Sequence, residues 1–108
     1  MDGFGFNSIS GTRNMIRELC QEIGLNMVLF LADGTTYYGL LQRIEDGRVA
    51  RLTPAGGQQN VVVIPPNGIA YLEDFTLIDL CTIVAKSVNA NTYPFDGLDI
   101  AGGGVIND

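Results

Sequence analysis

The stretch from Val28 to Leu52, VLFLADGTTYYGLLQRIEDGRVARL, decides the fold of this chain. It contains three short apolar runs separated by two turn dipeptides, Asp33-Gly34 and Asp46-Gly47. Glycine reaches positive φ without a Cβ clash, and aspartate hydrogen-bonds to its own backbone, so each dipeptide is typical of a tight turn between antiparallel strands. The stretch therefore predicts three consecutive strands.

The middle strand carries a glycine, Gly39, between Tyr37 and Leu41. Alternate residues of a strand point to the same face, so these three residues share the inward row. Gly39 leaves a gap in that row where the strand can bend sharply, which predicts a small barrel. The Tyr37-Tyr38 pair could stack on a nucleic-acid base, but alternation sends the two rings to opposite faces, and we expect both to pack.

The composition is that of one acidic domain. The chain has 108 residues, 46% hydrophobic content and a net charge of −6, and this length is typical of a single domain. No apolar run approaches the roughly 18 residues of a membrane span, and no leader pattern is visible, so we expect no membrane association and a cytoplasmic location. Cys20 and Cys81 lie far apart without any histidine, so we expect two buried thiols and no metal or cofactor.

A helix is predicted before the strands, over residues 12–24. Ser10 or Thr12 can cap its first turn, and Gly24 suits the left-handed position just past its end. A loose arm, residues 1–11, precedes it. The helical face is defined by five apolar residues at helical spacing: Met15, Ile16, Leu19, Cys20 and Ile23.

Two more strands are predicted after the flexible loop Pro54–Asn60. The fourth strand is Val61–Ile64. Pairing stops at Pro65-Pro66 because proline lacks an amide donor. A turn through Asn67-Gly68 then leads to the fifth strand, Ile69–Leu72, and completes a domain of residues 12–74.

Residues 75–108 are expected to form a C-terminal extension. Leu77, Cys81 and Val84 lie on one possible helical face with Asp74 as a cap, so we favour a helix over residues 75–88, although the Thr, Ile and Val content also permits a strand. The following residues contain a proline and several glycines and should form an arm outside the core. Their apolar side chains suggest that this arm docks on a barrel or a partner.

The first three strands resemble the first motif of the Sm and Sm-like family, in which a polar-Gly turn precedes aromatic-x-Gly-x-Leu and then an apolar-acidic pair. Residues 64–72, IPPNGIAYL, look like the second motif, Ile-Arg-Gly-x-x-Ile-x-x-Ile, with Pro65-Pro66 in place of Arg-Gly. The resemblance implies an all-β fold, namely a five-stranded, strongly bent antiparallel SH3-like barrel with an N-terminal helix and a C-terminal extension. The matching positions are Asp33-Gly34, Tyr37, Gly39, Leu41, Ile44 and Glu45 for the first motif, and Ile64, Ile69 and Leu72 for the second.

In the family, the turns after the second and fourth strands line the pore of a ring and hold single-stranded, often uridine-rich RNA. Only Glu45 nearly matches the family's pocket. Glycine, valine and proline supply neither a stacking platform nor donors for a base edge, so we expect a degenerate uridine pocket. The resemblance assigns the RNA contacts to Glu45, Asp46, Gly47, Arg48, Val49, Pro65, Pro66 and Asn67.

The charge is uneven along the chain. Arg43, Arg48 and Arg51 gather around the second turn, and a ring could concentrate them on one surface that attracts RNA phosphates. Equally, these arginines could solvate an exposed hairpin and pair with Glu45 and Asp46. The sequence leaves both interpretations open.

Ring assembly is expected from unpaired strand edges. An open barrel leaves two edge strands, and pairing the fourth strand of one subunit with the fifth strand of the next satisfies both. The resemblance implies rings of about five to eight subunits, since head-to-tail contacts close when the rotation fits. The predicted interface comprises Val61, Val62, Val63, Ile64, Ile69, Ala70, Tyr71 and Leu72.

The leading hypothesis is therefore a ring-forming protein of phage or bacterial type that binds RNA or ribonucleoprotein and is not an enzyme. The alternative is a protein-interaction or structural ring without RNA, whose partners bind through the C-terminal tail. A small hydrolase ranks third, because the acidic pairs Glu45-Asp46 and Glu73-Asp74 fall at strand ends where carboxylates solvate turns.

Overall fold

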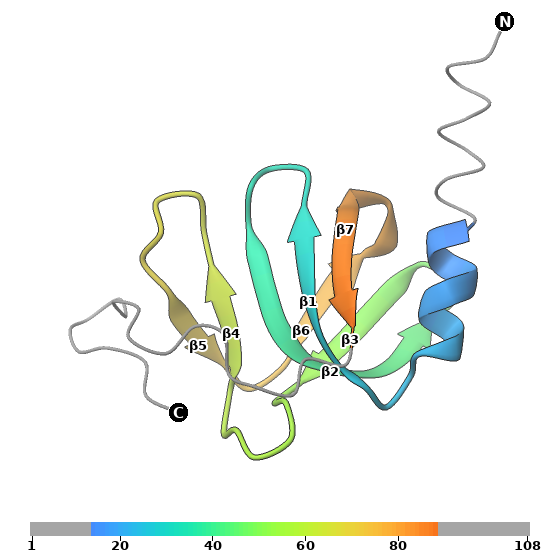
Figure 1. Ribbon diagram of the computed structural model, residues 1–108, viewed down its shortest axis with the longest axis horizontal. Coiled ribbons are helices and arrows are strands. Elements are labelled where there is room, and N and C mark those ends of the chain that lie inside the picture. The colour runs from blue at the N-terminus through green and yellow to red at the C-terminus, as the bar shows by residue number, and fades with distance from the viewer. Residues whose placement is uncertain (1–13, 89–108) are drawn as a thin grey trace, which may run out of the picture.

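The computed structural model describes residues 14–88, which form one helix and a single antiparallel sheet (Figure 1). The helix covers residues 14–21. The all-β class predicted from the sequence is confirmed. The remaining elements, in chain order, are β1 (Asn26–Leu31), β2 (Thr36–Glu45), β3 (Val49–Thr53), β4 (Val61–Ile64), β5 (Tyr71–Glu73), β6 (Thr76–Asp79), the short 3₁₀ helix η1 (Leu80–Thr82) and β7 (Ile83–Val88).

The seven strands occupy five positions across the sheet, because two pairs of short strands lie end to end. β4 and β3 follow one another along β2, since residues 36–38 of β2 pair with β4 and residues 40–45 pair with β3. In the same way β5 pairs with β4, and β6 pairs with β3. β1 lies between β2 and β7. Across the sheet the order is therefore β5 and β6, then β4 and β3, then β2, β1 and β7.

β2 changes partner at Gly39, the residue at which the sequence predicts a bend. A Cβ at this position would lie 2.7 Å from the Thr53 carbonyl oxygen, closer than real side chains approach. Only glycine permits this contact. A bulge between Leu41 and Arg43 adds curvature immediately afterwards. The gap in the inward row is thus filled by the end of β3. Figure 1 shows that β2 is strongly bent along its length.

The two tight turns predicted at Asp33-Gly34 and Asp46-Gly47 are confirmed. The Asp33 carboxylate accepts a hydrogen bond from the Thr35 amide at 2.9 Å, which lowers the pKa of Asp33. In the β2–β3 turn, residues 46–48, both Asp46 and Gly47 have positive φ, 55° and 65°, and the Arg48 amide donates to the Glu45 carbonyl oxygen at 3.0 Å. Positive φ at two successive residues is typical of tight hairpin turns that follow the twist of the strands.

The core lies on two faces of the sheet. The first cluster contains Leu29, Leu41 and Leu52 and is covered by Leu19 of the helix. The second cluster lies on the opposite face and includes Tyr38. Tyr37 packs against the first cluster, so the two tyrosine rings pack on opposite faces, as predicted.

The prediction of two buried thiols is wrong, because Cys20 and Cys81 are both exposed. Cys20 follows the buried Leu19, and one residue turns a helix by about 100°, which carries the thiol to the outer side. Cys81 follows the buried Leu80 in η1. Gly24 has φ +96°, which agrees with its predicted position past the helix end.

The helix favoured over residues 75–88 is also wrong, and the strand alternative is right. β6 pairs with β3 and β7 pairs with β1, so the backbone of this segment is hydrogen-bonded across the sheet. Asp74 caps no helix; instead, the Asp79 carboxylate accepts from the Cys81 amide and opens η1. The sheet extends past the predicted boundary at residue 74. The predicted arms at residues 1–11 and 89–108, and the caps Ser10 and Thr12, lie outside the described residues.

Candidate functional site

The two turns assigned to RNA lie at different ends of the sheet (Figure 1). The β2–β3 turn carries Glu45 to Val49, beside the helix. The β4–β5 turn carries Pro65 to Asn67 and lies against the β1–β2 turn, where a Cβ on Gly34 would meet Pro66 Cγ at 3.4 Å. The Asn67 carboxamide accepts from the Ile69 amide at 2.9 Å and so serves its own turn. Pro65, Pro66 and Asn67 therefore do not form one site with Glu45, Asp46, Gly47, Arg48 and Val49.

The neighbour of the β2–β3 turn is η1. The Leu80 amide donates to the Arg48 carbonyl oxygen at 2.8 Å, and Asp79 pairs with Val49 at the start of β3. This neighbour was not predicted from the sequence. The signal was present, because Ile78 and Ile83 have the spacing of the first two apolar anchors of the family's second motif. If residues 78–83 are compared with that motif, Asp79-Leu80 stands where the motif has Arg-Gly.

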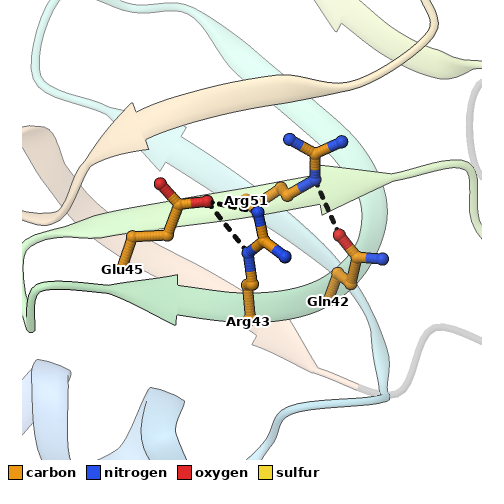
Figure 2. A network of polar contacts seen from close by, with 4 residues as sticks. All are labelled: Gln42, Arg43, Glu45 and Arg51. Carbon is orange, nitrogen blue, oxygen red and sulfur yellow. Dashed lines mark hydrogen bonds and ion pairs between the residues drawn. The ribbon is translucent and has the colours of Figure 1, made fainter.

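Two arginines, a glutamate and a glutamine gather on one side of β2 and β3, at Arg43, Arg51, Glu45 and Gln42 (Figure 2). Arg43 pairs with Glu45, with Nη2 at 2.8 Å and Nε at 2.9 Å from Oε2. Arg51 Nε donates to Gln42 Oε1 at 2.7 Å. The Arg51 guanidinium also lies over the Phe75 ring, 4.0 Å from its centroid.

Of the two interpretations left open for the arginines, the pairing with Glu45 is seen for Arg43, and the attraction of RNA phosphates stays a prediction. Arg43 is neutralised by Glu45, as a solvated hairpin requires. Arg51 contacts a neutral amide and an aromatic ring, and Arg48 forms no side-chain ion pair among the described residues. No acidic side chain of residues 14–88 therefore compensates the charge of either arginine. A guanidinium stacked on a ring offers a positive charge beside a flat face, and this combination suits phosphates and unstacked bases.

The predicted ring interface is wrong for the fourth strand. β4 pairs with β2 on one side and with β5 on the other, so it has no free edge. Its side chains are also buried in the core: Val61 is 0% exposed, and Val62 and Val63 are 1% exposed. Ile64 packs against the second cluster, and Ala70 is a member of it.

The unpaired edges of the described sheet are β5 with β6 on one side and β7 on the other. β5 includes Tyr71 and Leu72 from the predicted interface, and all three of its residues are exposed. On the opposite edge Val84 of β7 is 63% exposed. Large exposed apolar side chains gather along and beside the first edge: Ile69, Tyr71, Leu72, Phe75 and Leu77.

An ion cluster ties β7 to the helix. Lys86 Nζ lies 3.0 Å from Glu18 Oε1 and from Glu22 Oε1, and donates to Glu22 Oε2 at 3.1 Å. Burial alone would lower the pKa of Lys86, but the hydrogen bonds to Glu18 and Glu22 outweigh it and raise the pKa. This cluster holds the helix against the sheet.

Comparison with models of known protein families and with curated proteins found no match to this chain. Within residues 14–88 no helix is long and apolar enough to span a membrane. The same residues hold no group of three or more His, Cys, Asp or Glu side chains placed to bind a metal ion.

Proposed function

We propose that the protein is a divergent Sm-like subunit of a homo-oligomeric ring and works as an interaction scaffold. The observation that carries this proposal is that, among residues 14–88, the sheet edges β5 with β6 and β7 are unpaired and are bordered by exposed apolar side chains. Unpaired strand edges attract further strands, and soluble proteins usually cover or charge them.

The topology supports the Sm-like assignment. Five strand positions, a second strand that bends at the glycine of the first motif, and a short 3₁₀ turn between the two outer strands suit a small, strongly bent SH3-like barrel. In the ring, β5 and β6 of one subunit pair with β7 of the next. The two edges differ, so the contact is head-to-tail, and such contacts close into rings when the rotation fits.

The test is the mass of the purified protein by light scattering after gel filtration. We expect an oligomer, and we expect Val84→Lys to dissociate it, because a lysine on an edge strand opposes further pairing. Val84→Thr is the matched control, since it keeps the β-branched shape without a charge. A wild-type monomer at tens of micromolar, or an unchanged oligomer in Val84→Lys, would overturn the proposal.

RNA binding is the second candidate, and the stacking of Arg51 on Phe75 favours it. The uncompensated Arg48 lies on the neighbouring turn, so a strand of RNA could meet both cations. Asp79 in place of the family's cation and the net charge of −6 oppose tight binding. We therefore propose weak, salt-dependent binding through the backbone rather than a uridine pocket.

The RNA candidate is tested with short homopolymer RNAs at two salt concentrations. Arg48→Glu should weaken binding to every sequence alike and reduce the salt slope by about one contact. Arg17→Glu makes the same charge change on the exposed helix and should change neither. Tight uridine-selective binding that survives Arg48→Glu contradicts this mode, and absence of binding by the wild type leaves the ring as an interaction scaffold without RNA.

A further inference from the structure

The outer face of the sheet carries a continuous apolar row. Register pairs Val28 with Tyr38, Tyr38 with Val62, and Val62 with Leu72, so these side chains lie side by side across four strands. The row lies on the face opposite the helix and the first core cluster. In an antiparallel sheet with one solvated face these positions would be polar.

The middle of this row is deeply buried. Val28 is 5%, Tyr38 3% and Val62 1% exposed, whereas Leu72 at the edge is exposed. Neighbours in the same sheet flank a side chain but do not cover its end, so a buried sheet face requires a second layer. The described members of the cluster come from β1, β2 and β4 and from residues that border the sheet: Val28, Tyr38, Ala55, Val62, Ala70 and Ile64.

The position at which the described chain ends indicates what supplies that layer. Val88 pairs with Met27, and Ser87 pairs with Val28, so β7 ends beside the apolar row. Crossing from β7 to β5 spans four strand spacings, roughly 19 Å, which about six extended residues cover. The twenty residues that follow Val88 suffice for this crossing, and apolar side chains recur among them at Tyr93, Phe95, Leu98 and Ile100.

We propose that residues 93–100 bind across the outer face of the sheet of their own subunit and cover the Val28–Tyr38–Val62 row. The N-terminal arm is the less suitable occupant, because it continues from the helix, which packs on the opposite face. The tail thereby acts as an internal ligand of the fold. This inference is independent of ring formation and of RNA binding.

The test compares two full-length variants. In the tail variant Tyr93, Phe95, Leu98 and Ile100 are all replaced by serine; in the control variant Phe4 and Phe6, in the other arm, are replaced by serine. We expect the tail variant to bind a hydrophobic dye several-fold more strongly than the wild type and to melt several degrees lower at every protein concentration. The control variant should match the wild type in both measurements. An unchanged tail variant, or a change found in the control variant instead, would overturn the proposal.

A double-mutant cycle with Val62→Thr distinguishes direct contact from general destabilisation. Val62→Thr places a hydroxyl in the buried row and should lower the melting temperature of the wild type. Residues in contact give non-additive effects, so the same substitution should lower the melting temperature of the tail variant much less. Additive shifts would show that the tail does not touch this face.

Discussion

Gly39 fixes the shape of the sheet through one close approach. An ideal Cβ built on Gly39 would lie 2.7 Å from the Thr53 carbonyl oxygen. This oxygen belongs to the backbone and cannot move without shifting β3. We expect Gly39→Ala to lower the free energy of unfolding by about 1–3 kcal/mol, the usual cost of overpacking. Denaturant titration measures this change.

Gly56→Ala is the matched control for Gly39→Ala. Its added Cβ would lie 3.7 Å from the nearest atom, Asn26 Nδ2, which is an ordinary contact. We expect a change within about 0.5 kcal/mol, as at other surface sites. Equal losses in the two variants would show that the approach to Thr53 is not what makes Gly39 necessary.

Lys86 gives the fold a dependence on alkaline pH. Hydrogen bonds to Glu18 and Glu22 raise its pKa above the ordinary value of 10.5 in spite of partial burial. A raised lysine pKa stabilises the fold fully below the unfolded value, and this contribution disappears as the pH rises through the folded value. We expect Lys86→Met to cost about 1–2 kcal/mol at neutral pH, between exposed and buried ion pairs.

The pH series separates charge from packing at this position. The difference between the wild type and Lys86→Met should shrink above pH 10.5, whereas Lys86→Arg, which stays charged, should keep its stability there. A constant difference at all pH values would assign the effect of Lys86 to its aliphatic stem.

At the scale of elements, the segment from residue 75 to residue 88 shows where sequence reasoning stops. Its apolar residues fit a helical face, but Thr76, Ile78 and Ile83 are β-branched and suit strands equally. The choice is made by the partners, since β3 and β1 each present an open side for pairing. Those partners are distant in sequence, so the helix and strand propensities of the segment alone do not identify them.

η1 joins the two outer strands, and Asp79 holds it by two local bonds. Its carboxylate accepts from the Cys81 amide at 2.9 Å, and its carbonyl accepts from the Thr82 hydroxyl at 2.7 Å. We expect Asp79→Ala to lower the free energy of unfolding by about 1 kcal/mol, as for other lost caps. Asp79→Asn retains an acceptor oxygen and should retain most of the stability. Denaturant titration of both variants measures the two changes. An equal loss in both would show that the cap of η1 does not contribute to stability.

At the scale of the molecule, the turns, the bend and the first four strands could be predicted, because each depends on local glycine, aspartate and alternation patterns. The unpaired edges of the described sheet could not be predicted in this way. The sequence predicts an edge strand at Val61–Ile64, but β2 and β5 pair with both of its sides. The candidate RNA site was half predicted for the same reason: the β2–β3 turn is local, whereas its neighbour η1 follows from the pairing of β6 with β3.

If the edges join subunits, stability must depend on concentration. Association that requires the folded state raises the melting temperature as the protein becomes more concentrated. We expect the wild type to melt at a higher temperature after each tenfold increase in concentration. Val84→Lys should melt at one temperature throughout, because its edge no longer pairs, while Val84→Thr should follow the wild type. A wild-type melting temperature that does not change with concentration would mean that β5, β6 and β7 keep free edges in solution.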